Sequence, residues 1–209
     1  MIARLVAAAV VLALTAGCGV ARSGANPTKP PTPTSVTTTS ADLLPPRPRD
    51  LDLTGVDPCA QVLTDQQLRE LSYDLGYRSA PIAGEDGISG GPSCMFASAH
   101  PIFENEIDRN LVTRVIVSTS EGAEAWLTDP LRSSAAELSR QTVVEGFPAL
   151  VIPHPEFGDY CSVAVDTADG QYLLAAVTRY SGDDTTYDPY CAEARRVTAM
   201  GIRTLSASR

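Results

Sequence analysis

The feature that most restricts the fold of this chain is an Asp169-Gly170 pair between two apolar segments. Residues 161–168 precede the pair and residues 171–178 follow it, and apolar side chains dominate both segments. Asp-Gly favours a two-residue turn with positive φ angles, which matches the twist of two antiparallel strands. The sequence therefore predicts a β-hairpin here, and with it an antiparallel sheet.

Two helices are predicted from signals at their first residues. Thr64 is a natural N-cap, and Gln67 three residues later completes a capping-box pattern. Asp188 followed by Pro189 is typical of the start of a helix. We expect these helices to cover residues 64–75 and 188–205.

The remaining segments place strands and helices in separate groups. Strands are expected at residues 93–98, 111–119 and 141–152, the last with a bend at residues 146–148, and shorter helices at residues 121–127 and 130–139. Because hairpins and helices are grouped and do not strictly alternate, the sequence predicts an α+β fold. We expect two layers, an antiparallel sheet of about five strands with the helices on one side.

Four cysteines lie among these predicted elements, at Cys59, Cys94, Cys161 and Cys191. Four cysteines allow three pairings. We expect the disulfides Cys59–Cys94 and Cys161–Cys191. Each would join neighbours in sequence and link the start of a helix, marked by Asp-Pro, to a strand, and each would stabilise the fold by roughly 3–4 kcal/mol. No Cys-x-x-Cys pair and no cysteine-histidine cluster at ligand spacing occurs, which argues against a redox enzyme and a zinc site.

A fifth cysteine, Cys18, ends a signal-like segment. Arg4 precedes an apolar stretch at residues 5–14, and Thr15-Ala16-Gly17 leads to the cysteine. The stretch is about half as long as a membrane-spanning helix, so the pattern favours a bacterial lipoprotein signal peptide. A plain secretory peptide is the alternative, because Thr15 stands where the lipoprotein pattern prefers a branched apolar residue. We expect residues 1–17 to be removed and Cys18 to carry the lipid, including palmitate, that anchors the chain on the extracytoplasmic face of the cell membrane.

Residues 18–55 are expected to form a tether outside the folded domain. Residues 23–50 are rich in proline, threonine and serine and poor in apolar side chains, which is typical of disorder. Extended polyproline chain rises about 3 Å per residue, so the tether would hold the domain up to ~90 Å from the membrane. It is either a spacer with sugars on its threonines or a plain tether. The folded domain is expected at residues 56–205, followed by a tail at residues 206–209.

The charge of the chain excludes some classes of partner. The formal net charge is −9, and loss of residues 1–17, with Arg4, would make it one unit more negative. An acidic domain without a basic run is a poor partner for nucleic acid or for anionic lipid headgroups. We therefore expect no nucleic-acid partner, and contact with the membrane through the lipid on Cys18.

Together these motifs resemble the actinobacterial lipoprotein family of domain of unknown function 3558. The shared motifs are, in order, Cys18, the Thr/Pro-rich tether, Asp57-Pro58-Cys59 before Val62-Leu63-Thr64, the glycine-rich loop into Ser93-Cys94, residues 144–149, the Cys161 strand and Asp188-Pro189-Tyr190-Cys191. Phe96 departs from the family pattern, which has a tryptophan two residues after the cysteine. The resemblance spans nearly the whole mature chain and implies a cell-envelope lipoprotein with two disulfides. It implies no enzymatic activity.

One serine matches the nucleophile-elbow pattern of hydrolases. Ser89 lies in Gly87-Ile88-Ser89-Gly90-Gly91, and Asp108 or Asp129 followed by His154 would supply a triad in the right chain order. An elbow requires a strand before the serine and a helix after it. Here a glycine-rich loop precedes Ser89 and a strand follows, so a turn-forming loop is the better interpretation.

Other polar residues also favour ordinary structural roles. The two histidines, His100 and His154, each adjoin a proline, and we expect both at the surface. Asp183-Asp184 and Asp188 lack the spacing of a calcium loop, so we interpret them as a solvated turn and a helix cap. We accordingly expect no catalytic residue, no metal site and no cofactor.

Three aromatic residues leave two interpretations open. Phe103, Trp126 and Phe157 either belong to the core, which we favour, or line a groove for a ligand.

The leading functional hypothesis is a non-enzymatic, lipid-anchored envelope protein whose domain binds another envelope component, most simply a protein. The alternative is a carrier or sensor of a small apolar or glycolipid ligand held between sheet and helices. A hydrolase rests on Ser89 alone. A cavity above about 300 Å³ with apolar walls would favour a ligand, and an exposed apolar patch would favour a protein.

Overall fold

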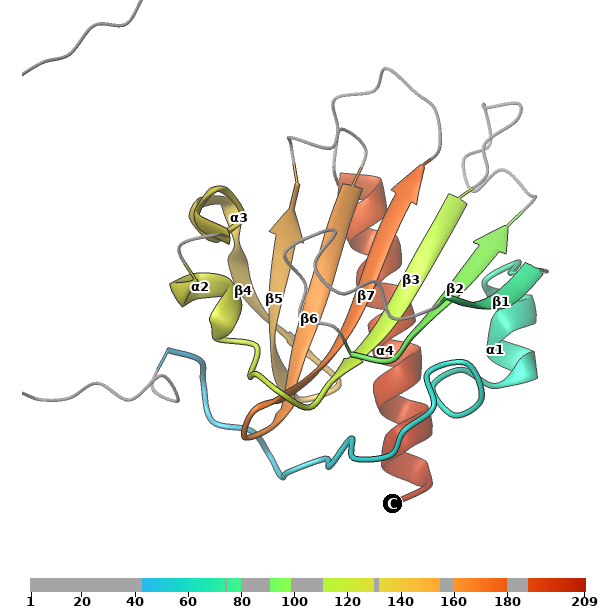
Figure 1. The fold of residues 1–209 in the computed structure, drawn as a ribbon, viewed down its shortest axis with the longest axis horizontal. Coiled ribbons are helices and arrows are strands. Elements are labelled where there is room, and N and C mark those ends of the chain that lie inside the picture. The colour runs from blue at the N-terminus through green and yellow to red at the C-terminus, as the bar shows by residue number, and fades with distance from the viewer. Residues whose placement is uncertain are drawn as a thin grey trace, which may run out of the picture. The chain divides into compact units, whose positions relative to one another are not determined.

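The structure is a computed structural model in which the chain forms two units, residues 1–37 and 38–209. It describes residues 43–73, 75–79, 91–98, 111–129, 132–154, 160–179 and 188–209, all in the second unit (Figure 1). The elements are α1 (Asp65–Glu70), β1 (Leu75–Ser79), β2 (Ser93–Ser98), β3 (Leu111–Ser118), α2 (Ala125–Thr128), α3 (Ser133–Leu138), β4 (Arg140–Val144), β5 (Phe147–Pro153), β6 (Tyr160–Ala168), β7 (Gln171–Arg179) and α4 (Asp188–Ala207).

The strands form one antiparallel sheet of seven strands in the order β1-β2-β3-β7-β6-β5-β4. The predicted hairpin is confirmed as β6 and β7, joined at Asp169-Gly170, where Gly170 has a φ of 69°. This hairpin lies near the middle of the sheet, between β3 and β5 (Figure 1). The predicted α+β class and antiparallel sheet are therefore correct.

The expected number of about five strands is wrong, because two strands were hidden in the predicted elements. Helix α1 ends at Glu70, and Ser72 then adopts a positive φ of 56°, so the chain turns and Leu75–Ser79 becomes a strand. The predicted strand at residues 141–152 is a second hairpin, β4 and β5. Its two turn residues, Glu145 and Gly146, have φ values of 51° and 87°, which reverses the chain where only a bend was expected.

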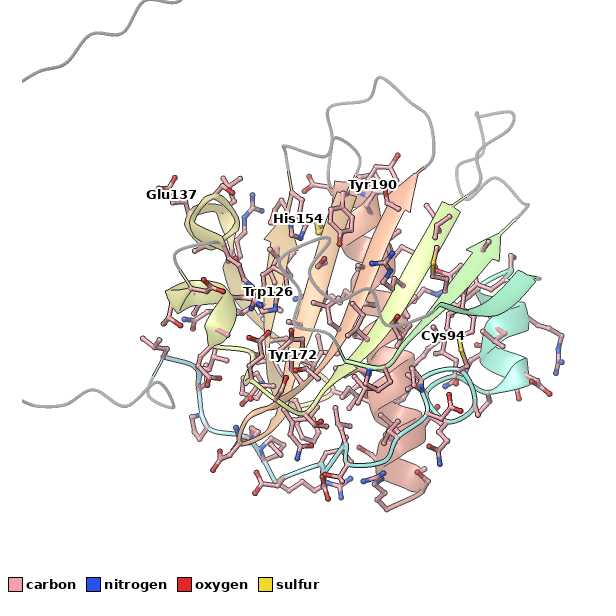
Figure 2. The ribbon with its side chains drawn as sticks, viewed as in Figure 1. Cys94, Trp126, Glu137, His154, Tyr172 and Tyr190 are labelled. Atoms are coloured by element: carbon pink, nitrogen blue, oxygen red, sulfur yellow. A yellow bond between two sulfur atoms is a disulfide. The ribbon has the colours of Figure 1, made fainter. Side chains whose placement is uncertain are left out.

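Helices cover both faces of the sheet, which corrects the expectation of helices on one side. On one face, α4 packs across β6 and β7 beside α1. On the other face, Trp126 of α2 packs with Leu150, Tyr172 and Leu174, and α3 contacts β5 (Figure 2). The central strands require cover on both faces, because every residue of β6 is buried.

Both predicted helix starts are present in the structure. Thr64 accepts a hydrogen bond from the N–H of Gln67, and the Gln67 side chain accepts one from the N–H of Thr64, which completes the capping box. Helix α4 begins at Asp188 and buries Ala194, Val197 and Leu205 against the sheet. Because apolar residues recur at helical spacing, α4 presents one continuous apolar face.

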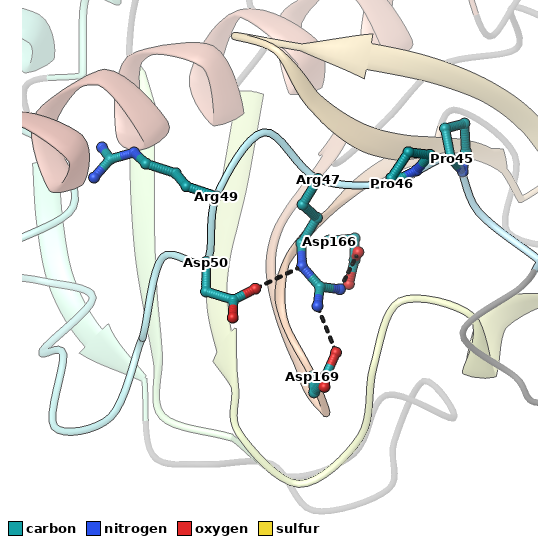
Figure 3. Close-up of a pocket in the computed structure, with 7 residues that line it drawn as sticks. All are labelled: Pro45, Pro46, Arg47, Arg49, Asp50, Asp166 and Asp169. Carbon is teal, nitrogen blue, oxygen red and sulfur yellow. Dashed lines mark hydrogen bonds and ion pairs between the residues drawn. The ribbon is translucent and has the colours of Figure 1, made fainter.

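Residues 43–55 belong to the folded domain, which corrects the expected domain start at residue 56. Leu51 and Leu53 are almost completely buried in the core on the α4 face. The N–H of Leu51 donates to the carbonyl of Thr167 at 2.7 Å. Arg47 forms ion pairs with Asp50, Asp166 and Asp169 (Figure 3). Apolar burial and ion pairing together hold this segment against the β6–β7 hairpin.

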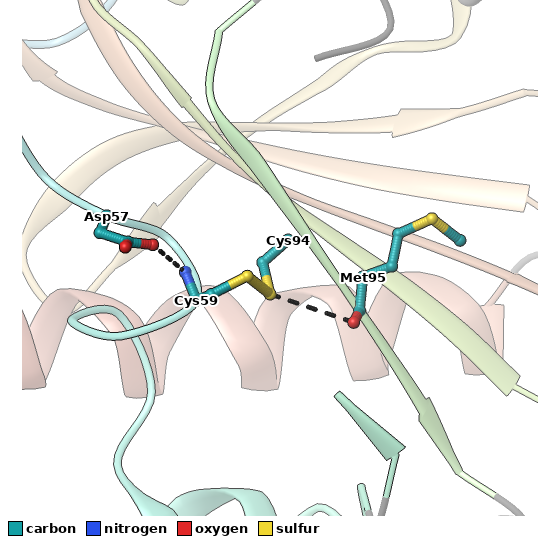
Figure 4. The surroundings of a disulfide bond; sticks show 4 residues. All are labelled: Asp57, Cys59, Cys94 and Met95. Carbon is teal, nitrogen blue, oxygen red and sulfur yellow. Dashed lines mark hydrogen bonds between the residues drawn. A yellow bond between two sulfur atoms is a disulfide. The ribbon is translucent and has the colours of Figure 1, made fainter. Parts of the chain in front are cut away.

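The disulfides of the described domain join Cys59 to Cys94 and Cys161 to Cys191, the pairing expected from the sequence. Cys59 lies in the turn before α1 and Cys94 in β2, while Asp57 Oδ1 accepts a hydrogen bond from the N–H of Cys59 (Figure 4). Cys161 of β6 is bonded to the first turn of α4. The two bonds thus fasten the covering helices to the sheet.

Candidate functional site

Several residues singled out in the sequence lie outside the described residues. These are Cys18, Ser89, His100, Phe103, Asp108, Phe157, Asp183 and Asp184. The anchor and the elbow pattern therefore stay predictions. Of the possible triad members, Asp129 and His154 are described.

His154 is buried, which corrects its expected place at the surface. Its side chain is 3% exposed and stacks on Tyr160 with ring centroids 4.3 Å apart. Its Nε2 lies 3.1 Å from Oγ of Ser162, a hydrogen bond whose direction depends on the histidine tautomer. The expectation failed because Pro153 ends β5 inside the sheet, so the next residue still lies over the covered face.

Trp126 anchors the buried polar groups around His154. Its ring meets His154 edge-on at 5.9 Å, and the guanidinium of Arg132 lies 4.6 Å from its centroid. Arg132 forms an ion pair with Glu121 at 2.9 Å, and Tyr172 donates a hydrogen bond to the same Glu121 oxygen at 2.9 Å. These contacts fasten α2 and α3 to the sheet.

This cluster does not have the geometry of a hydrolase site. Ser162 has no exposed surface, so it offers substrate no access. Asp129 Oδ2 forms an ion pair with Arg132, 3.5 Å from its Nε. Trp126 belongs to the core, which is the interpretation favoured from the sequence. We interpret the cluster as part of the packing of the domain.

A first pocket of about 330 Å³ surrounds Arg47, where residues 45–50 meet the β6–β7 hairpin (Figure 3). Arg47 Nη1 lies 2.6 Å from Oδ2 of Asp166, whose side chain is 6% exposed. Burial raises the pKa of Asp166, and the neighbouring Arg47 guanidinium offsets part of that rise. The charges in this pocket are satisfied within the chain, so we interpret it as a structural clasp.

A second pocket is a groove of about 380 Å³ between the β4–β5 hairpin and the first turns of α4. Its walls carry Arg140, Thr142 and Val151 from the sheet and Asp188 and Arg195 from the helix. Arg140 and Arg195 are both exposed. The groove therefore brings two cations to the surface of an acidic chain.

The groove runs beside β4, an edge strand of the described sheet. Strand β4 is last in the strand order, and no described strand pairs with its outer side. Val143 of β4 is 58% exposed and Leu138, just before the strand, is 43% exposed. An edge strand carries unpaired backbone groups that bind an extended chain from another protein.

Neither the edge nor the groove was predicted from the sequence. Residues 141–152 were expected to form one strand, so β4 was not expected as a strand of its own. A signal was present in Glu145-Gly146 between two apolar runs, but glutamate is not a usual first residue of such a turn. The groove itself needs α4 and β4 to meet, and these segments are far apart in sequence.

Two kinds of feature are absent from the described part of the chain. No group of three or more metal-ligating side chains occurs among the residues with assigned positions. Within the same residues, no helix has the length and apolar character to cross a bilayer.

Comparison with known protein families gives a match over most of the chain. The family model described as "Protein of unknown function (DUF3558)" matches residues 13–204, nearly the whole chain. No curated protein and no solved structure matches the sequence. The resemblance drawn from the cysteine, proline and glycine motifs thus agrees with the match, and the chain belongs to the DUF3558 family.

Proposed function

We propose that this protein is a non-enzymatic, lipid-anchored lipoprotein of the cell envelope whose domain binds another envelope protein through β4. One observation carries the proposal: no described strand pairs with the outer side of β4, and this edge, with Val143 exposed on it, lies beside a groove lined by two exposed arginines. Open edges are usually short, covered or charged because they recruit other chains. An edge that keeps an exposed valine favours a binding role.

The anchor is part of the same proposal. The signal-like segment ending in Cys18 supports removal of residues 1–17 and attachment of a lipid to Cys18, which places the domain on the extracytoplasmic face of the membrane. The two disulfides support an oxidising compartment. An actinobacterial origin, which the family resemblance implies, is part of the same proposal.

A carrier of an apolar ligand has less support. Such a ligand requires a pocket with mainly apolar walls. The two pockets described above exceed about 300 Å³. Arginine and aspartate side chains line both of them. Their chemistry favours polar contacts, so an apolar or glycolipid ligand is the less supported hypothesis.

Photo-crosslinking in native membranes tests the proposal. A benzophenone amino acid at Val143 of the full chain should yield one defined crosslinked envelope protein, identified by mass spectrometry. The same amino acid at Gln66, exposed on α1 near the other edge of the sheet, serves as the matched control. Equal crosslinking at both positions, or none at Val143, would contradict a binding role for β4.

A fractionation experiment tests the anchor separately. Cys18→Ala should move the protein from the membrane to the soluble extracytoplasmic fraction, because the chain would lose its lipid. Cys59→Ala, which removes a disulfide cysteine instead, should remain at the membrane. Unchanged membrane association of the Cys18→Ala protein would contradict lipid anchoring.

A further inference from the structure

We infer that β4 recognises an extended segment of a protein in which acidic and apolar side chains alternate. This inference rests on the proposed function and names the chemistry of the partner. It follows from three features of the edge: the direction of its free backbone groups, the charge on one face and the apolar side chains on the other.

The register of the β4–β5 hairpin decides which backbone groups are free. In a two-residue hairpin the residues that flank the turn exchange hydrogen bonds, here Val144 and Phe147. Bonded and non-bonded pairs alternate along an antiparallel ladder. Val143, opposite Pro148, is therefore a non-bonded position, which agrees with the missing N–H of proline. The N–H and C=O groups of Gln141 and Val143 point outward, where an added strand would pair.

The α4 face of the edge is cationic. Arg140 and Thr142 lie on this face, because Thr142 pairs with Ala149, which is buried in the α4-side core. Arg140 lines the groove with Arg195, and neither arginine has an ion pair within the described residues. Asp188, at the start of α4, is the acidic side chain of the groove. The local balance still favours carboxylates from a partner, and their pairing would neutralise both arginines.

The opposite face of the edge is apolar where it is exposed. Val143 projects to this side, as its neighbours Thr142 and Val144 project to the α4 side. Leu138 at the end of α3 is the other large apolar side chain exposed in the described domain. Gln141 also lies on this side and donates to the carbonyl of Leu43. An apolar side chain of the partner would cover Val143 while its neighbours meet the arginines.

Because side chains of a strand alternate between faces, one extended segment meets both surfaces only if its own residues alternate in character. Side chains that point to the groove must be acidic, and those that point away from α4 must be apolar. A helix would not present this period of two. The backbone of the edge thus selects a partner segment in extended conformation, and Arg140, Arg195 and Val143 select its sequence.

Peptide binding tests this inference on the purified, oxidised full chain. The probe is a fluorescein-labelled ten-residue peptide of alternating aspartate and valine, measured by fluorescence anisotropy. The controls are an alternating lysine-valine peptide and a shuffled peptide with the composition of the probe. Two reversed charge contacts should make the lysine peptide bind about tenfold more weakly than the aspartate peptide.

Variants of the chain test separately whether the peptide is recognised through the β4 backbone and through the charges of the groove. Val143→Pro removes an outward N–H without removing a β4–β5 hydrogen bond, and should abolish binding of the aspartate peptide. Arg140→Glu with Arg195→Glu should reverse the preference toward the lysine peptide. Arg69→Glu, an exposed arginine on α1, is the matched control and should leave binding unchanged. Circular dichroism and thermal unfolding establish that each variant is folded.

The outcomes distinguish this inference from the proposed function. Equal affinity for the aspartate and lysine peptides, or for the shuffled peptide, would overturn the alternating acidic pattern. Crosslinking at Val143 in membranes would then still support a protein partner at β4. Binding of phosphatidylglycerol vesicles through Arg140 and Arg195, with no peptide binding, would overturn the inference in favour of lipid headgroups.

Discussion

At the scale of single residues, the least expected feature is the burial of acidic and other polar side chains inside the domain. Glu193 on α4 is 7% exposed. The hydroxyl of Tyr73 donates to it at 3.3 Å, and Arg196 lies 3.7 Å from it. Burial raises the pKa of Glu193, and the positive charge of Arg196 and the hydrogen bond from Tyr73 offset that rise only in part. An ionised Glu193 therefore costs folding free energy.

Replacement of Glu193 tests this cost. In the folded state Glu193 binds its proton more tightly than in the unfolded state, so its contribution to stability is present at low pH and is lost as the pH rises through the raised pKa. Glu193→Gln should increase the free energy of unfolding at pH 7, by about 1 kcal/mol. Urea unfolding measures the gain, which should shrink below about pH 4.5, near the unfolded pKa of glutamate. Glu137→Gln, exposed on α3, should change stability little at either pH.

At the scale of elements, some segments are specified by signals in neighbouring residues, and others are held in place by contacts with distant residues. The capping box starts α1 and the Asp-Gly turn joins β6 to β7. By contrast, residues 43–55 have no secondary structure of their own and are held by contacts with distant residues. Arg47 is the main polar contact of this segment, since it bonds the buried Asp166 of β6.

Loss of the Arg47 clasp should destabilise the domain. Arg47→Ala would leave Asp166 buried without its ion-pair partner, and breaking a buried pair typically costs about 3–5 kcal/mol. Because Arg47 keeps some exposure, we expect about 2–3 kcal/mol, read as a lower urea midpoint. Arg49→Ala is the matched control, because Arg49 is exposed and bonds only the carbonyl of Ser206 in the described domain. Equal effects of the two substitutions would contradict the clasp.

At the scale of the whole molecule, the domain is a sheet that helices cover on both faces. Residues 43–55 pack against it at the β6–β7 hairpin. The core on the α4 face includes Leu51, Leu53 and Val56, so the folded unit begins before residue 51. Leu44 packs against the opposite core. The boundary of the folded domain is therefore set by burial and not by composition.

Two truncations test this boundary. A chain that begins at residue 43 should keep nearly full stability, because every described contact remains. A chain that begins at residue 56 loses Leu51 and Leu53, each worth about 2–5 kcal/mol when fully buried. It should therefore unfold at much lower urea, by about 4 kcal/mol or more. Equal unfolding midpoints of the two truncated chains would indicate that residues 43–55 belong to the tether and not to the folded domain.

The sequence by itself determined the features that depend on neighbouring residues or on covalent chemistry. The central hairpin and the two helix starts follow from local turn preferences and capping hydrogen bonds. The favoured one of three possible cysteine pairings, which joins neighbours in sequence, is the one that the structure contains. The tertiary structure alone decided the burial of His154, the inclusion of residues 43–55 and the placement of helices on both faces. It also decided the groove between Arg140 and Arg195, which are distant in sequence. These features depend on which surfaces meet after the chain folds, and apolar burial is non-directional, so no short pattern in the chain specifies them.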